Sequence, residues 1–191
     1  MKHPLLVDSS EAWLSKVLDN FDEFLIDHAA NERKASAMAL SMVAHYPDKA
    51  LLLETMVDLA LEELNHYRQV IRIMVSRDLI PGADEKDLYV NQIIKRIRRG
   101  SREYFLDRLL SASVIEARGT ERFHLIGERI SDGKLATFYK TLARSEQNHH
   151  ELFQKLAATY FEPEEINSRW NEWLQIEADI ILELPIRARL H

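Results

Sequence analysis

Glu62-Glu63-Leu64-Asn65-His66 is one of two matching segments in this chain, and the other is Glu146-Gln147-Asn148-His149-His150. Each segment contains Glu-x-x-His. Positions i and i+3 of an α-helix lie next to each other on one face of the helix. Each segment can therefore direct a carboxylate and an imidazole toward the same point.

Both segments interrupt a helical face that is otherwise apolar. The apolar positions on these two faces are Leu52, Met56, Leu59, Val70 and Ile73 around the first segment, and Leu135, Phe138, Leu142, Phe153 and Leu156 around the second. A carboxylate in an apolar core is costly unless it has a partner or takes up a proton. A metal ion is a partner that also suits a neutral imidazole.

Two further glutamates lie on apolar helical faces in the same way. Glu32 follows Leu14, Leu18, Phe21 and Leu25 at helical spacing, and Glu116 lies between Phe105 and Phe123. Glu63 follows Glu32 by 31 residues and Glu146 follows Glu116 by 30, so the chain reads as one helical hairpin used twice. The resulting ligand set is Glu32, Glu63, His66, Glu116, Glu146 and His149. Four carboxylates and two histidines are typical of a di-iron or di-manganese site in a four-helix bundle.

Several neighbouring residues compete for these roles. Glu63 is preferred to Glu62 because only Glu63 keeps the spacing to His66, and Glu116 is preferred to Glu121 because it lies on the apolar face. His150 remains an alternative to His149. Residues whose place near the ligands stays open are His28, one turn before Glu32, and Asn31, Asn65 and Asp107, which could orient ligands through hydrogen bonds.

The composition predicts an all-α protein of one domain, residues 1–191. Gly and Pro together number ten, and strong helix formers dominate. The chain has no Cys, which excludes disulfides and a cysteine-bound iron–sulfur cluster on it. No signal-like segment and no run of about 18 apolar residues is present, so we expect a soluble protein with a cytoplasmic location as the default.

The pattern predicts five main helices. We expect them over 12–45, 49–77, 101–130, 134–160 and 162–184, with a long linking segment over 84–100 between the second and third. The fold class is thus a four-helix bundle with a long crossover and an extra C-terminal helix. We expect the trailing Arg187, Arg189 and His191 to fray.

A basic cluster stands out at the end of the linking segment: Lys95, Arg96, Arg98, Arg99 and Arg102. The chain as a whole is acidic, with a net charge of −6, so general nucleic-acid binding is not expected. Two interpretations of the cluster stay open. It is either a solvated helix end whose cations favour the helix dipole, or a phosphate-binding patch.

Mixed carboxylate and imidazole ligands suit iron or manganese, and iron is preferred if dioxygen is used. Six protein ligands exceed the usual tetrahedral set of zinc.

The chain resembles the tRNA 2-methylthio-isopentenyladenosine hydroxylases (MiaE), a ferritin-like di-iron family. The resemblance covers nearly the whole chain and rests on four stretches: His28–Lys34, Glu63–His66, Val114–Arg118 and Glu146–His149. No ligand position departs from the family pattern.

The resemblance implies O₂-dependent hydroxylation of the isopentenyl side chain on a modified adenosine beside the tRNA anticodon. It implies two iron ions with oxygen and carboxylate bridges, held by the six ligands named above. Two electrons would come from a separate reductase or ferredoxin-like donor. The basic cluster then becomes a candidate contact for the phosphates of the anticodon loop, whose unstacked bases a protein can reach.

Other classes would use the same helices differently. An iron-storing ferroxidase predicts a large hollow assembly and iron uptake beyond two ions per chain. A peroxide-scavenging di-iron protein usually brings a Cys-bound electron site, which this chain lacks. A helical adaptor would bind no metal.

Overall fold

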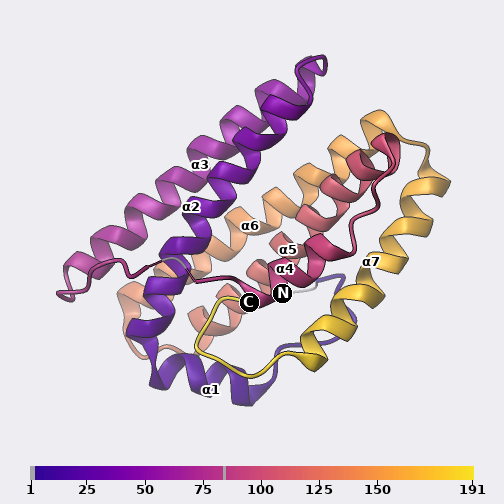
Figure 1. Cartoon of the computed structure of the whole chain (residues 1–191). Helices are drawn as coiled ribbons and strands as arrows, with labels where there is room; N and C mark the ends of the chain where they lie inside the picture. The colour runs from indigo at the N-terminus through magenta and orange to yellow at the C-terminus, as the bar shows by residue number, and fades with distance from the viewer. Residues whose placement is uncertain (1–2, 84) are drawn as a thin grey trace. The chain divides into compact units, whose positions relative to one another are not determined.

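The computed structural model describes residues 3–83 and 85–191, and within them the chain forms seven α-helices and no strand (Figure 1). The helices are α1 (Glu11–Asp19), α2 (Phe21–His45), α3 (Ala50–Val75), α4 (Leu88–Lys95), α5 (Ser101–Arg129), α6 (Gly133–Tyr160) and α7 (Pro163–Glu183). This confirms the predicted all-α class. It also confirms the predicted extra C-terminal helix, which is α7.

The first long helix is divided, where the sequence pattern predicts one helix over 12–45. Asn20 has φ −129° and ψ 46°, outside the helical region, and α2 begins after it. The Asn20 carbonyl accepts a hydrogen bond from the backbone N–H of Phe24 at 3.1 Å. Asn is favoured at such a starting position over a helix interior.

The linking segment contains a short helix, α4. Asp84, with which the predicted segment begins, lies outside the described residues. Asp87 caps α4, because its carboxylate accepts a hydrogen bond from the backbone N–H of Val90 at 2.9 Å. The crossover is therefore partly helical.

Contacts divide the chain into two compact units. The first, called the α2–α3 unit, comprises Asp19–Glu85 and Ala188–Leu190. Helices α2 and α3 lie side by side as a hairpin, and the Ser36 hydroxyl donates to the Ala60 carbonyl at 2.8 Å (Figure 1). The buried apolar side chains of this hairpin include Leu25, Ala39, Met42, Leu52, Met56, Leu59, Val70 and Met74.

The trailing residues are held in place, so the expectation that they fray is wrong for Arg189 and His191. Arg189 lies 3.4 Å from Glu23 and 3.2 Å from Glu85, and the backbone N–H of Leu190 donates to Asp27 at 2.7 Å. Within the other unit, the His191 ring stacks on Tyr89.

The second unit, called the α5–α6 unit, comprises the chain up to Leu18, Lys86–Arg187 and His191. Helix α5 packs along α6, while α7 contacts α4, α5 and α6. The fully buried Arg118 of α5 donates to Glu177 of α7 at 2.8 Å and to Glu121 at 3.1 Å. The Glu121 carboxylate also accepts from Ser9. These bonds fasten α7 and the N-terminal segment to α5.

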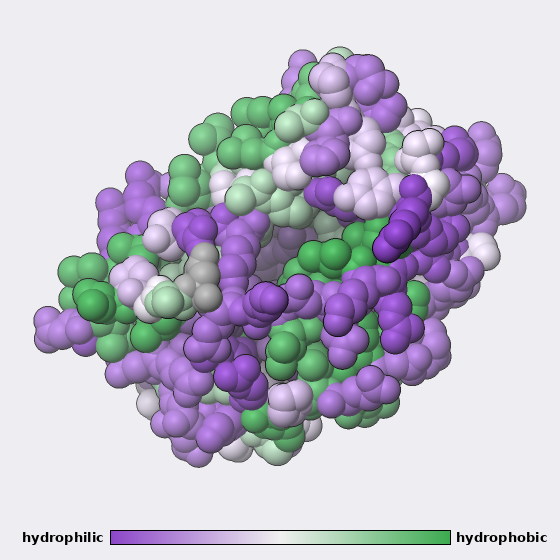
Figure 2. All heavy atoms as spheres, viewed as in Figure 1, coloured by the Kyte–Doolittle hydropathy of each residue, from purple (hydrophilic) through white to green (hydrophobic). Residues whose placement is uncertain are grey.

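One face of the α2–α3 hairpin is apolar and exposed. In Figure 2, hydrophobic side chains gather over this hairpin, where Val57, Leu61 and Leu64 of α3 are 42%, 59% and 50% exposed. At about 100° per residue, Glu63 and His66 point to the opposite side of α3. None of the described helices contains an apolar stretch of membrane-spanning length.

Candidate metal centre

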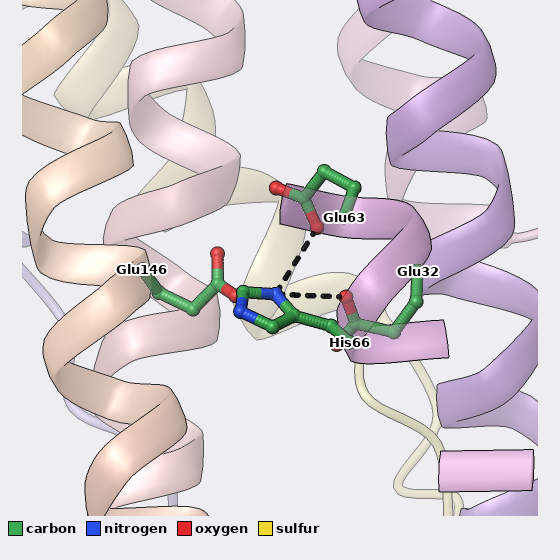
Figure 3. Close-up of side chains that lie close together, drawn as sticks. All are labelled: Glu32, Glu63, His66 and Glu146. Atoms are coloured by element: carbon green, nitrogen blue, oxygen red, sulfur yellow. Dashed lines mark ion pairs between the residues drawn. The ribbon is translucent and has the colours of Figure 1, made fainter. Parts of the chain in front are cut away.

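Three predicted ligands come together in the α2–α3 unit. Glu32 lies on α2, and Glu63 and His66 lie one turn apart on α3 (Figure 3). The His66 Nδ1 atom is 3.5 Å from Glu32 Oε2 and 3.5 Å from Glu63 Oε2. Each residue offers one ligand atom within 4.8 Å of the others, and all three are buried. We call this group the first half-site.

The other three predicted ligands come together in the α5–α6 unit. Glu116 lies on α5, and Glu146 and His149 lie one turn apart on α6. The His149 Nδ1 atom is 3.3 Å from Glu146 Oε2. Again the three residues offer ligand atoms within 4.8 Å of one another, and all are buried. We call this group the second half-site; Glu146 is the fourth side chain drawn in Figure 3.

The chemistry of each half-site fits a divalent metal ion. Each contains two buried carboxylates and one imidazole. Two carboxylates carry more negative charge than one imidazole can neutralise, even when it is protonated, and such an excess is costly away from water. A metal ion would neutralise it, and oxygen and imidazole donors are those that iron and manganese accept.

The residues that compete for ligand roles are either exposed or bonded elsewhere. Glu62 is exposed, and Glu121 pairs with Arg118 at 3.1 Å. His150 Nδ1 lies 2.8 Å from the Ser113 hydroxyl and 2.9 Å from the Ser113 carbonyl. Burial lowers the pKa of His150, which favours its neutral form. The structure thus gives His150 a packing role beside α5.

The residues proposed to orient the ligands also bond elsewhere. Asn31 donates to Asp27, and Asn65 accepts from Arg68. Asp107 accepts hydrogen bonds from Arg98 and Arg169 instead. The pair of Asp107 and Arg169 joins positions 62 residues apart, so helical spacing alone could not reveal it.

His28, which is not in the predicted ligand set, contacts the predicted ligand Glu32. Its Nε2 atom lies 2.6 Å from Glu32 Oε1, and its side chain is fully buried. The spacing i, i+4 on the apolar face of α2 is the signal that points to this contact.

The basic cluster is divided between structural and exposed cations. Arg98 binds the buried Asp107 through two nitrogens, and Arg102 pairs with Glu165 at 2.7 Å and lies over the Phe161 ring. Lys95, Arg96 and Arg99 are exposed, and their side chains form no ion pair in the described parts of the chain. Only these three therefore present uncommitted charge.

A pocket of about 720 Å³ also lies in the α2–α3 unit. Ile26, Ala30 and Arg33 of α2 line it, with Tyr67 of α3 and Pro81–Ala83. These α2 positions are rotated by about 100–160° from Glu32 around the helix. The pocket is therefore separate from the first half-site.

Curated relatives of this chain are tRNA hydroxylases. The chain is 34% identical over 150 residues to a tRNA 2-(methylsulfanyl)-N(6)-isopentenyladenosine(37) hydroxylase of Pseudomonas putida, a match covering 78% of this chain and 73% of the relative. A hydroxylase of the same name from Salmonella typhimurium is 33% identical over 140 residues, which are 73% of this chain but about half, 51%, of the relative.

A solved structure is similar as well. It is described as protein 43 with aldehyde deformylating oxygenase activity, from Synechococcus. It has a TM-score of 0.93 and 31% identity, and the match covers 98% of this chain and 94% of that chain. This confirms the predicted ferritin-like helical fold. The family model described as tRNA-(MS2IO6A)-hydroxylase (MiaE) matches residues 1–191, and the chain therefore belongs to this family.

Proposed function

We propose that this protein is a di-iron monooxygenase that hydroxylates the isopentenyl side chain of 2-methylthio-N6-isopentenyladenosine in tRNA. The observation that carries the proposal is the repeated set of two buried carboxylates and one imidazole in a chain that belongs to the MiaE family. The proposed reaction consumes O₂ and two electrons.

In this proposal the two half-sites hold two iron ions together, within one ferritin-like domain of residues 1–191. Each half-site supplies three ligands, so neither alone fills the coordination sphere of an iron ion. Carboxylates can bridge two ions, and the pair would complete its coordination with oxygen ligands. Support comes from the matching order of Glu, then Glu-x-x-His, in both hairpins.

The bound iron would supply the activation of dioxygen, and the protein would supply the surroundings. The apolar residues on both ligand faces, such as Leu59 and Leu142, are buried and keep water from the carboxylates. Because the six predicted ligands lie on helices, their donor atoms are held in position before a metal ion binds.

The partners follow from the reaction. With no Cys on the chain, a separate reductase or ferredoxin-like protein would deliver the electrons. The exposed Lys95, Arg96 and Arg99 would contact phosphates of the anticodon loop, and this RNA substrate favours a cytoplasmic location. Arg98 and Arg102 are better assigned to holding the fold, given their pairs with Asp107 and Glu165.

Nucleoside mass analysis tests the reaction directly. The iron-loaded protein is incubated with O₂, a chemical reductant and tRNA carrying the unhydroxylated nucleoside, and the tRNA is then digested. We expect a gain of one oxygen on this nucleoside, absent with Glu63→Ala. Its absence from the wild-type reaction, with two irons bound, would overturn the assigned substrate.

A second reaction deserves a parallel assay because the similar solved structure is described as an aldehyde deformylating oxygenase. The same iron-loaded protein is incubated with an aldehyde in place of tRNA. Turnover of the aldehyde without turnover of tRNA would favour this second function. The comparisons give no support to the ferroxidase alternative, whose test remains iron uptake beyond two ions per chain.

A further inference from the structure

The half-buried Tyr104 and Arg108 lie one turn apart on α5, directly after the basic cluster. Arg108 Nη1 donates to the Tyr104 hydroxyl at 3.3 Å, and the guanidinium carbon lies 5.8 Å from the centre of the Tyr104 ring. The guanidinium is therefore held beside the ring at the distance of a weak cation–π pair. Arg108 forms no ion pair with any described acidic side chain, so its charge adds to that of Lys95, Arg96 and Arg99.

The next residue of α5 shows how an aromatic ring of the core differs from Tyr104. Phe105 is buried, and the centre of its ring lies 5.3 Å from that of Tyr160 and 5.5 Å from that of Phe161. Tyr104 contacts no aromatic ring in the parts of the chain that the structure describes. A half-buried ring that is held by an arginine and has no ring partner offers a π-face on which a flat ligand can stack.

Asp107 joins this pair to the basic cluster. Its carboxylate accepts from the backbone N–H of Arg98 at 2.8 Å and from the guanidinium of Arg98 at 2.9 Å and 3.1 Å. Arg169 of α7 donates to the same carboxylate at 2.8 Å and to the Arg96 carbonyl at 3.2 Å. Because Asp107 is fully buried, these bonds hold the segment with the exposed cations against the turn of α5 that begins at Tyr104.

The pair is displaced from the second half-site along α5. At 1.5 Å per residue, Arg108 and Tyr104 lie about 12 Å and about 18 Å before Glu116 along the axis of this helix. At about 100° per residue, they lie about 80–120° around the axis from Glu116. One base with a five-carbon side chain is shorter than the longer of these distances. A base stacked on Tyr104 would therefore belong to a nucleotide that neighbours the modified adenosine.

We propose that Tyr104 and Arg108 form a stacking contact for an unpaired base of the tRNA anticodon loop, next to the phosphate contacts of Lys95, Arg96 and Arg99. The inference rests on the proposed function, and it adds an aromatic contact to the electrostatic one. Bases of single-stranded RNA stack on tyrosine rings and on guanidinium planes, while cations follow the phosphates. A paired stem has no unstacked base, so this contact selects the loop.

Fluorescence anisotropy with labelled RNA tests the contact on the full-length protein. One probe is a hairpin with the sequence of an anticodon stem and loop, and the other is a fully paired RNA duplex. Tyr104→Leu removes the ring, and Tyr104→Phe keeps the ring without its hydroxyl. Tyr46→Leu is the matched control, because it removes a half-buried tyrosine of the α2–α3 unit. Each affinity is measured over a range of salt concentrations, which separates a loss of stacking from a loss of charge.

We expect Tyr104→Leu to weaken binding of the hairpin roughly 5- to 100-fold, the effect of losing one stacked base. The slope of log K against log salt should stay the same, because no phosphate contact is lost. Tyr104→Phe should keep most of the affinity, and Tyr46→Leu should bind as the wild type does. An unchanged hairpin affinity of Tyr104→Leu, or an equal loss on the duplex, would overturn the inference.

The wild-type protein gives a second measurement if Tyr104→Leu does not fold. Hairpins with 5-iodouridine in the loop are crosslinked to the protein by light, and the protein is then digested with trypsin. We expect an adduct on the peptide of residues 103–108. Adducts confined to other peptides would overturn the inference.

Nucleoside mass analysis separates this inference from the proposed function. Hydroxylation of tRNA by the wild type, with no response of binding to the change at Tyr104, refutes the inference alone. Loop binding that depends on Tyr104, without hydroxylation, supports the contact and refutes the proposed reaction.

Discussion

Replacing Glu63 by Gln should stabilise the metal-free protein while removing its response to metal. Glu63 and Glu32 are both buried, and their ligand oxygens lie within 4.8 Å of each other. While both are ionised they repel, and a Gln at position 63 keeps the shape without the charge. The proposed metal ligand Glu63 would thus destabilise the protein without metal.

The size of the effect follows from this separation. Two charges at 4.8 Å repel by about 3 kcal/mol at an effective dielectric constant of about 20. His66, 3.5 Å from both carboxylates, offsets part of this repulsion. A net gain of roughly 1–3 kcal/mol remains, which for a chain of this length raises Tm by roughly 2–12 °C.

Thermal unfolding in the presence of a chelator measures the gain. Glu62→Gln is the matched control, because it makes the same charge change one residue away on the exposed side, where about 0.5 kcal/mol or less is expected. Added Fe²⁺ at about 100 times Kd should stabilise the wild type by about 2.7 kcal/mol and Glu63→Gln much less. A metal-free Glu63→Gln protein that melts at or below the wild type, with Glu62→Gln unchanged, would refute the electrostatic argument.

Three further predictions concern other parts of the chain. Arg118→Met should destabilise the protein by about 3–5 kcal/mol in urea unfolding, because Glu177 then stays buried without its guanidinium, and Arg118→Lys should recover only part of this. Burial raises the pKa of Asp107, but the hydrogen bonds from Arg169 and Arg98 lower it by more, so the folded pKa is lowered. The stabilisation that ionised Asp107 provides is therefore present above its unfolded pKa of about 3.9 and is lost as the pH falls through the lower folded pKa. Asp107→Asn should accordingly lose stability at pH 7, and its difference from the wild type should shrink as the pH falls below about 3.9. A loss that does not depend on pH would contradict this. Lys95→Ser with Arg99→Ser should weaken tRNA binding and reduce the slope of log K against log salt by roughly 1–2, with unchanged iron content.

The local parts of the site could be predicted from the sequence. Glu63 with His66, and Glu146 with His149, are neighbours because of helical spacing alone, and their burial follows from the apolar residues around them. Placing Glu32 beside Glu63, and Glu116 beside Glu146, needed the added observation that both hairpins keep nearly the same offset.

Contacts between distant residues could not be predicted in this way. The partners of Asp107 include Arg169, 62 residues away, and no periodic pattern joins them. Similarly, the break between α1 and α2 depends on the backbone angles of Asn20, which the pattern of apolar residues does not indicate. The bond from His28 to Glu32 has the spacing of a helical pair, but its existence depends on side-chain rotamers that the sequence does not specify.

The return of Ala188–Leu190 to the α2–α3 unit has a consequence for protein synthesis. Leu190 donates to Asp27, 163 residues earlier in the chain. At the usual rate of about 5–20 residues per second, roughly 8–30 s separate the translation of these two residues. Until Arg189 and Leu190 are translated, the nascent hairpin lacks their contacts with Glu23 and Asp27. Chaperones and proteases therefore encounter the hairpin before these contacts form.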